Sequence, residues 1–441
     1  MLQTSANGRF LAHDDGRPFF YLADTAWELF HRLTFSEAEY YLRDRAANGF
    51  TVIQAVVLAE LGGLTVPNWR GHLPLRDNDP TRPIEAYFEH VDAVIALATS
   101  LGLHIGLLPT WGDKWNTKWG MGPEIFTPEN ARIYGEFLGG RYADSDLIWI
   151  LGGDRPVETE AHRLIIRAMA DGLRAGDGGS HLIGFHTWGP HSSTEYVADE
   201  TWIDLHMIQS GHLRNRENWR TIEADYALTP SRPVMDAEPG YEDSQNDIVD
   251  LQGGYLDDYD VRKAMYWSLF AGSHGHTYGC WPIWCMWRPG LPPILARRPW
   301  YEALPLPGSR QVRHAKELLL SRPYFERVPD QSLVASDPEP GTYHVQATRD
   351  ASGRYVMAYI PATRTRNFGP TEPPGSVVLD LTSMSGAELA AWWFDPRTGI
   401  ASSAGDVPRG NRVRFTPPLG GPDWVLVVDD AACGFPPPGQ R

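Results

Sequence analysis

The chain has 441 residues, more than one hydrophobic core usually organises, so we expect two domains. With 42% hydrophobic and 21% charged residues, it has the composition of an ordered globular protein. A formal net charge of -16, with no cluster of Lys and Arg, excludes nucleic acid and anionic membranes as favourable partners.

The first two thirds of the chain alternate β-rich runs with helical patterns. The strand candidates are 19–24, 50–57, 103–110, 146–154, 182–188, 203–209, 233–238 and 275–281. Helices with a capping residue or an acidic first turn are predicted at 34–49, 84–102, 127–143, 158–173, 215–228 and 257–272. The helix after the fifth strand is missing or very short. Eight strands with intervening helices predict an α/β fold, a (β/α)8 TIM barrel, over residues 1–322.

After Arg322 the β-rich runs follow one another without helical segments. They are 342–350, 353–361, 376–381, 387–399, 411–418 and 423–430, with turns such as DASG and DPRTG between them. They predict a smaller all-β sandwich domain over 323–432, followed by a tail at 433–441. The connector SRPYFERVPD covers 321–330, where we expect proteases to cut.

Two carboxylates are prominent by position, because the reactive side chains of a (β/α)8 barrel lie at the carboxyl ends of its strands. Asp154 ends the fourth strand and Glu238 the seventh, and these strands lie nearly opposite in a ring of eight. Glycoside hydrolysis needs two facing carboxyl groups, which a retaining enzyme holds roughly 5 to 5.5 Å apart. Either residue alone could equally cap the following helix. Together they predict Asp154 as general acid/base and Glu238 as nucleophile.

The other residues at the strand ends suit a neutral, hydroxyl-rich ligand. Amides and carboxylates hold hydroxyl groups, and Trp faces stack on sugar rings. The candidate substrate-binding residues are Asp24, Gln54, Trp111, Lys114, His186, Trp188, Gln209, Tyr278 and Trp281.

Several carboxylates have a second interpretation. Asp24 is about equally compatible with an N-cap of the helical turn AWELF. Asp236 points the same way as Glu238 and is a rival nucleophile, although its deeper position favours a buried supporting role. We interpret Glu60, Asp113 and Glu242 as solvated loop residues and leave them out of the catalytic set.

A metal site is the main alternative chemistry. His186, His206, His274 and His276 could form one, but the first strand lacks the HxH pattern of many barrel metallohydrolases, which favours buried histidines with structural partners. We therefore expect no metal and no cofactor. A metal-dependent barrel hydrolase or isomerase stays open as a second class of function, and a non-catalytic carbohydrate-binding protein as a third.

Four segments carry a family resemblance: NGRFLAHDDGRPFFYLADTAWELF, the GGDRP turn, PVMDAEPGYE and WWFDPRTG. They resemble the apiosidase-like glycoside hydrolases, glycoside hydrolase family 140, over nearly the whole chain. The resemblance implies a catalytic barrel with a C-terminal β-sandwich once labelled a collagen-binding domain. It also implies removal of apiose from plant pectic rhamnogalacturonan II. The family's acid/base Asp maps onto Asp154 in GGDRP, and its nucleophile Glu maps onto Glu238 in DAEPGYE.

The combined prediction is a glycosidase that cleaves a terminal or short-oligosaccharide bond by a retaining double displacement. Its expected partner is a neutral, hydroxyl-rich oligosaccharide, and the sequence does not indicate an oligomeric state. The first residues, MLQTSANGRF, lack the apolar region of a secretory signal, and no run approaches the ~20 apolar residues of a membrane span. We therefore expect a cytoplasmic protein, whereas members of the resembled family are often exported.

Overall fold

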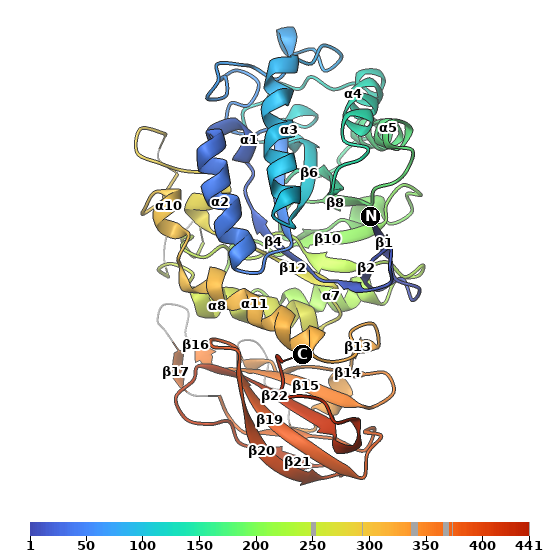
Figure 1. The fold of residues 1–441 in the computed structure, drawn as a ribbon, viewed down its shortest axis with the longest axis vertical. Helices are drawn as coiled ribbons and strands as arrows, with labels where there is room; N and C mark the ends of the chain where they lie inside the picture. Colours follow the sequence, from blue (N-terminus) through green and yellow to red (C-terminus); the bar gives the residue numbers. More distant parts are fainter. Residues whose placement is uncertain (248–252, 293, 337–342, 365–369, 373, 441) are drawn as a thin grey trace. The chain divides into compact units, whose positions relative to one another are not determined.

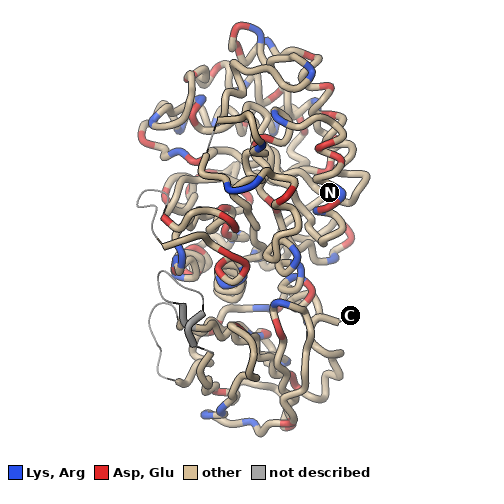
Figure 2. Tube along the Cα trace, turned by 90° about the vertical axis from the view of Figure 1, so that its left-hand side faces the viewer, with Lys and Arg blue, Asp and Glu red and all other residues tan. Residues whose placement is uncertain are grey.

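A computed structural model describes residues 1–247, 253–292, 294–336, 343–364, 370–372 and 374–440 (Figure 1). The chain forms two compact units. The first unit comprises Met1–Gln209 and Thr277–Leu304, and the second comprises Ser210–His276 and Pro305–Arg441. Basic and acidic residues are interspersed along both units (Figure 2). No helix in the described part of the chain is long and apolar enough to cross a membrane.

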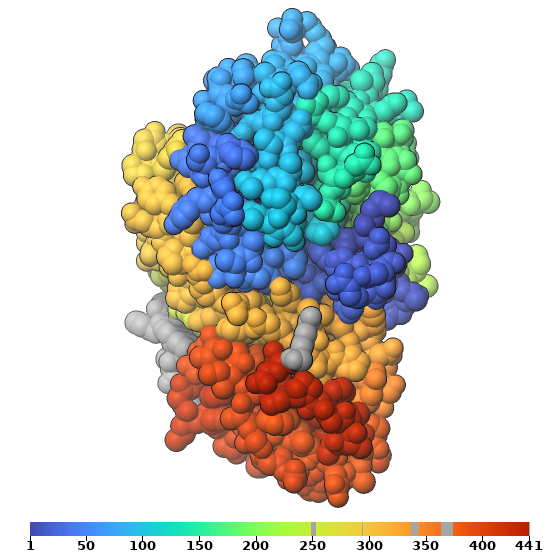
Figure 3. Space-filling model, viewed as in Figure 1, coloured from blue at the N-terminus to red at the C-terminus, as the bar shows by residue number. Residues whose placement is uncertain are grey.

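Eight strands form a closed barrel, as the sequence predicts. In barrel order they are β4 (Tyr21–Thr25), β5 (Val52–Leu58), β6 (His104–Thr110), β7 (Leu147–Gly152), β8 (Ile183–His186), β10 (Leu205–Gln209), β11 (Val234–Asp236) and β12 (Gly275–Tyr278). The short strand β9 (His191–Ser192) pairs antiparallel with β10. Before the barrel, β1 (Leu2–Thr4), β2 (Leu11–His13) and β3 (Pro18–Phe19) form a small sheet, and these first residues are visible at the surface in Figure 3.

The six predicted helices are present. They are α2 (Phe35–Ala47), α3 (Glu85–Ser100), α4 (Pro128–Arg141), α5 (Glu160–Asp177), α7 (Asn218–Tyr226) and α8 (Asp258–Phe270). Thr34, Thr127 and Asp257 begin α2, α4 and α8 with reciprocal capping boxes. After β8 there is only the four-residue helix α6 (Thr194–Val197), as expected. Four further helices are α1 (Leu29–Arg32), α9 (Trp281–Trp284), α10 (Trp300–Ala303) and α11 (Pro307–Leu320).

Helices α4 and α5 approach each other closely through glycines. A Cβ atom at Gly139 would lie 2.4 Å from the carbonyl oxygen of Leu173, and one at Gly172 would lie 2.2 Å from that of Arg132. At both positions only glycine lets the two backbones come this close. The glycines therefore fix the spacing of the helices that flank β7.

The C-terminal domain is built from antiparallel strands. Its six-stranded sheet has the order β13 (Arg327–Pro329), β14 (Gln346–Asp350), β15 (Tyr355–Pro361), β22 (Asp423–Asp430), β19 (Glu388–Asp395) and β20 (Ile400–Pro408). A second layer, β18 (Val377–Leu379) with β21 (Val413–Phe415), contributes to the same apolar core. The strands β16 (Thr363–Arg364) and β17 (Pro370–Glu372) form a separate pair. The sequence analysis missed β20, because IASSAGDVP is mostly exposed and lacks an apolar alternation.

The connector at 321–330 is partly buried, with Ser321, Arg322, Tyr324 and Arg327 buried and Glu326 exposed. Arg322 forms a bidentate ion pair with Asp429, at 2.9 and 2.7 Å. Arg327 is 1% exposed and donates to the carbonyl oxygens of Leu269 and Ser273. These contacts favour a connector that is held in place, and proteolysis at 321–330 stays a prediction.

Candidate active site

Asp154 stands on a turn that only a glycine-rich sequence can make. Gly152, Gly153 and Asp154 have φ values of 95°, 103° and 52° in succession, all in the left-handed region. A Cβ atom at Gly152 would lie 2.0 Å from the carbonyl oxygen of His186. Asp154 itself is a non-glycine residue in this region, and such strained residues concentrate at functional sites. The turn therefore presents the Asp154 side chain immediately after β7.

The Asp154 carboxylate has an aromatic and a cationic neighbour. Its Oδ2 accepts from the indole Nε1 of Trp119 at 3.2 Å and from Nη1 of Arg155 at 3.1 Å, and the side chain is 25% exposed. Arg155 is buried, and its Nη2 donates to Oε1 of Glu60 at 2.9 Å. One guanidinium group therefore contacts two carboxylates.

Glu60 belongs to this site, although the sequence analysis treated it as a solvated loop residue. Strand β5 continues to Leu58, so Glu60 follows the true end of the strand. Burial raises the pKa of Glu60 to about 7, and the nearby Asp154 and Asp113 carboxylates act in the same direction while Arg155 opposes them. A carboxyl group with this pKa can exchange protons near neutral pH.

Glu238, in the second unit, is 6% exposed and follows β11 by two residues. Its Oε1 lies 3.2 Å from Nε2 of His212, whose ring is in edge contact with Tyr241 at 4.3 Å. Its carbonyl oxygen accepts from the backbone N–H of Gly211 at 3.1 Å. Both the side chain and the backbone of Glu238 are therefore held by the loop that follows β10.

Asp236 has the buried supporting role that its depth favours. It is fully buried, and its Oδ2 accepts from Oγ of Ser210 at 2.7 Å and from Nδ2 of Asn218 at 2.9 Å. Burial raises its pKa to about 6, against hydrogen bonds that include one from the backbone N–H of Glu238. Asp236 therefore holds the segment that carries Glu238.

Four of the predicted substrate-binding residues lie around the strand ends of the first unit. Trp188 is half-buried, 5.7 Å from Trp119 between ring centroids, and stacks on His191 at 4.2 Å. Trp111 and His186 are buried and in contact at 5.8 Å. Gln209 ends β10, and its buried Oε1 has no hydrogen-bond partner among the described residues.

Two other predicted residues point away from the barrel interior. A Cβ atom at Gly106 would contact Tyr21 and Gln54, so these two side chains face the barrel interior. Side chains along a strand alternate, and residues an odd number of positions away from Tyr21 or Gln54 on the same strand therefore face outward. Asp24, three positions after Tyr21 on β4, faces outward. Its Oδ2 accepts from Tyr41 at 2.7 Å and from Arg45 at 2.5 Å, both on α2. The predicted substrate contact of Asp24 is therefore wrong, and so is its role as an N-cap, because α1 begins after Glu28.

Tyr278 also faces outward. Its ring lies 6.0 Å from that of Phe50 and 5.9 Å from the guanidinium of Arg45. It is 1% exposed and packs behind the barrel wall, a placement that does not favour contact with substrate.

Three other predicted contacts have partners within the protein, and their contact with substrate stays a prediction. Gln54 is in the middle of β5, where its Nε2 donates to Thr277 at 2.5 Å. Lys114 is fully buried in an ion pair with Asp113 at 2.7 Å. Trp281 is 9% exposed and donates through Nε1 to the carbonyl oxygen of Ile294 at 2.5 Å. These three side chains contribute to the protein interior.

The histidines do not gather into a metal site. Within the described residues, no three His, Cys, Asp or Glu side chains are arranged to hold a metal ion. Burial lowers the pKa of both His274 and His276 to about 3. His276 bonds to Oγ of Ser268 at 2.8 Å, and His206 to Oγ of Ser193 at 3.2 Å. These contacts are those of structural histidines.

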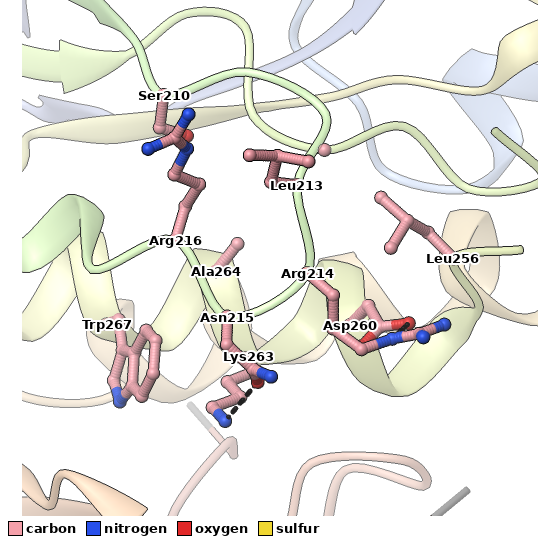
Figure 4. Close-up of a pocket in the computed structure, with 11 residues that line it drawn as sticks. Ser210, Leu213, Arg214, Asn215, Arg216, Leu256, Asp260, Lys263, Ala264 and Trp267 are labelled. Carbon is pink, nitrogen blue, oxygen red and sulfur yellow. Dashed lines mark hydrogen bonds and ion pairs between the residues drawn. The ribbon is translucent and has the colours of Figure 1, made fainter. Parts of the chain in front are cut away.

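A pocket in the second unit lies between the loop after β10 and helix α8 (Figure 4). In the figure, Lys263 faces Asn215, to which it donates at 2.9 Å. Arg214 is paired with Asp260 at 3.1 Å. These side chains bind one another and so attach the loop to α8. The pocket that they line is not the candidate active site.

Comparison with known proteins decides the family. A family model described as "Apiosidase-like, catalytic domain" matches residues 5–326. The chain belongs to the apiosidase-like glycoside hydrolases. A second family model, "Putative collagen-binding domain of a collagenase", matches residues 328–429. No curated protein gives a significant match.

Solved structures agree with this membership. A glycoside hydrolase is 33% identical with a TM-score of 0.86, over 98% of this chain and 97% of its own. A glycoside hydrolase family 5 structure from Bacteroides vulgatus ATCC 8482 has the same identity and TM-score, over 98% and 94%. Another structure from that organism, 13% identical with a TM-score of 0.67 over 97% and 82%, shares the fold alone. The apiosidase-like chain is therefore a glycosidase that binds carbohydrate.

Sequence reasoning missed four residues around the two carboxylates: Glu60, Trp119, Arg155 and His212. Arg155 directly follows Asp154, and Trp119 lies in the loop after the third strand, but nothing in the sequence shows that both contact Asp154. Glu60 would have been found if the apolar run FTVIQAVVLA had been followed to its end. His212 lies three residues after Gln209, within the same loop, and the rule of strand ends covers it if the loop is included.

Proposed function

We propose that this glycosidase cleaves a terminal or short-oligosaccharide glycosidic bond by a retaining double displacement, with Asp154 as general acid/base and Glu238 as nucleophile. The observation that carries the proposal is the placement of these carboxylates directly after β7 and β11, the fourth and seventh strands of the barrel. Both are held by neighbouring donors: Asp154 by Trp119 and Arg155, and Glu238 by His212.

The chemistry follows from two carboxyl groups with different tasks. Asp154, protonated, gives its proton to the leaving oxygen while the Glu238 carboxylate attacks the anomeric carbon and forms a glycosyl ester. Asp154 then accepts a proton from the water that attacks the ester, which releases the sugar and restores Glu238. Asp236 does not compete as nucleophile, because Ser210 and Asn218 already bind its Oδ2.

Substrate binding is assigned to the half-exposed aromatic residues next to Asp154. Trp119 donates to Asp154 and lies 5.7 Å from Trp188, so a sugar joined to the glycosidic oxygen would meet both rings. Gln209 offers an unbonded carbonyl oxygen to a hydroxyl group. We further propose a plant cell-wall pectic substrate with apiose-containing side chains, which is supported by the family name.

Azide rescue separates the two catalytic roles. Asp154→Ala should keep its activity on 4-nitrophenyl glycosides, since a good leaving group needs little protonation, and azide should restore turnover with a glycosyl azide of retained configuration. Glu238→Gly should give an azide of inverted configuration, because azide then attacks the opposite face. Anomeric NMR of the products distinguishes the two outcomes.

Two results would contradict this assignment. One is an Asp154→Ala variant that is as inactive on 4-nitrophenyl glycosides as on natural substrates. The other is a 2-fluoroglycoside inactivator that peptide mapping locates on Asp236. The sugar is identified first, by a screen of aryl glycosides and pectic oligosaccharides that includes apiosides and arabinosides. Absence of apioside cleavage alongside activity on another glycoside would remove only the substrate proposal.

A further inference from the structure

The buried guanidinium of Arg155 is shared between two carboxylates from different parts of the barrel. Its Nη1 lies 3.1 Å from Oδ2 of Asp154, and its Nη2 lies 2.9 Å from Oε1 of Glu60. Its Nε donates to the carbonyl oxygen of Trp119 at 2.9 Å, and it lies over that indole ring at 4.7 Å. Arg155 therefore has a fixed position between the two carboxylates. Because both contact the same guanidinium group, the charge on one carboxylate affects how easily the other loses its proton.

This arrangement creates a problem for a general acid. An arginine next to a carboxyl group favours the charged form and so removes the proton that Asp154 must donate. The indole N–H of Trp119 acts in the same direction, because it also bonds the Asp154 oxygen. A second negative charge on the far side of the arginine offsets both effects.

We infer that Glu60 is a positioning residue that neutralises Arg155 and thereby keeps a proton on Asp154 until the glycosidic oxygen takes it. The inference rests on the proposed role of Asp154 as general acid. Two carboxylates that share one cation cannot both ionise as easily as either one alone, so the pair holds one proton into a higher pH range. Burial raises the pKa of Glu60 to about 7, so Glu60 gains the charge that offsets Arg155 as the pH rises through this value.

The other charged groups around the pair are occupied by partners of their own. Asp113 pairs with Lys114 at 2.7 Å on the loop after β6. Glu158 pairs with Lys118 at 2.5 Å, and Glu28, whose Oε1 accepts from the N–H of Leu61, pairs with His31 at 2.7 Å. Arg155 is therefore a cation that Glu60 and Asp154 share.

The protonation of Asp154 can be measured without a substrate. A water-soluble carbodiimide with glycine ethyl ester converts a protonated carboxyl group into an amide and releases a urea. The peptide that contains Asp154 reports the extent of labelling by mass spectrometry at each pH. Glu60→Gln keeps an oxygen for Arg155 and removes only the charge. It should lower the pH of half-labelling by about one unit, the size expected for an opposite charge that is no longer offset.

Glu158→Gln is the matched control. It removes the same charge four residues from Asp154, but from an exposed side chain bonded to Lys118 rather than Arg155. It should leave the half-labelling pH unchanged. No shift in Glu60→Gln, or an equal shift in both variants, would overturn the inference. If Glu60→Gln does not fold, Glu60→Asp should give a smaller downward shift, since its charge is kept but withdrawn from Arg155.

Activity distinguishes this inference from the proposed function. On the methyl glycoside of the sugar found by the screen, the alkaline limb of kcat/KM should move down by about one pH unit in Glu60→Gln. On the 4-nitrophenyl glycoside, which needs little acid assistance, it should not move. If Asp154→Ala still cleaves the methyl glycoside normally, the proposed function fails. If that variant is inactive but Glu60→Gln changes neither the labelling nor the alkaline limb, the inference alone fails.

Discussion

Asp236→Asn should destabilise the protein most at acid pH, and its cost should shrink as the pH rises. The buried carboxyl has a pKa of about 6 in the folded protein against an ordinary 3.8. Below 3.8 both states are protonated. Between the two values the unfolded chain releases a proton that the folded protein keeps, so the folded protein loses stability up to about pH 6. At about 1.4 kcal/mol per pH unit, the total loss is about 3 kcal/mol.

Asparagine carries no charge in either state and avoids this loss. At low pH the variant should be less stable by roughly 1 to 3 kcal/mol, because an amide N–H2 cannot accept from Asn218. Between pH 4 and above pH 6 the parent loses about 3 kcal/mol of its free energy of unfolding and the variant does not. The difference between the two proteins should therefore shift by about 3 kcal/mol in favour of the variant. Urea unfolding followed by circular dichroism at pH 4, 5, 6 and 7.5 gives the free energy of unfolding of both proteins.

Ser210→Ala provides a comparison of opposite sign. It removes the hydroxyl that bonds Asp236 at 2.7 Å and favours its charged form. The cost of this change should therefore grow as the pH rises through 6, where the cost of Asp236→Asn declines. A difference between Asp236→Asn and the parent that does not vary with pH would refute the reasoning. Such a result would mean that Asp236 carries a charge in the folded protein as readily as in the unfolded chain.

Five further changes test other parts of the structure. Gly139→Ala should destabilise the protein by several kcal/mol, because its Cβ would collide with the facing helix at 2.4 Å. Gly140→Ala, which meets no atom nearer than 3.9 Å, should instead stabilise by up to about 1 kcal/mol in thermal melts. Arg262→Met removes the ion pair with the buried Asp423, at 2.9 Å, and should cost roughly 3 kcal/mol or more in urea unfolding. Trp188→Ala should reduce kcat/KM on oligosaccharides about tenfold without changing stability, since its ring is half-exposed. Asp395→Asn should lower the melting temperature slightly and leave turnover unaltered, because its ion pair lies in a turn of the C-terminal domain.

The fold was predictable from the sequence because each barrel strand is a short apolar run next to a capped helix. The run LHIGLLPT, for example, became β6 at His104–Thr110, and Thr127 begins the helix that follows. The missing helix after β8 was visible as a gap in the pattern. Strand β20 was not predictable, since its side chains are largely exposed and only the pairing with β19 defines it.

The site was harder to predict, because it depends on where each strand ends and which way each side chain points. Gln54 was chosen although it lies in the middle of the predicted strand, and Glu60, which follows the end of that strand, was interpreted as a solvated loop residue. Asp24 and Tyr278 were close to strand ends, but alternation turns both toward α2. Whether a residue faces the barrel interior depends on the register between neighbouring strands, and this register cannot be read from a single sequence.

The C-terminal domain contributes to the catalytic half that contains Glu238, although none of its residues is assigned to the chemistry. His344 of this domain stacks on Trp219 of α7 at 3.8 Å, and Gln346 donates to Glu223 of the same helix at 3.0 Å. Asn218, the first residue of α7, donates to Asp236, which in turn accepts from the backbone of Glu238. A short series of contacts therefore connects the sandwich to Glu238, the proposed nucleophile. Loss of the domain would expose α7 and loosen the carboxylate that Asp236 holds in place.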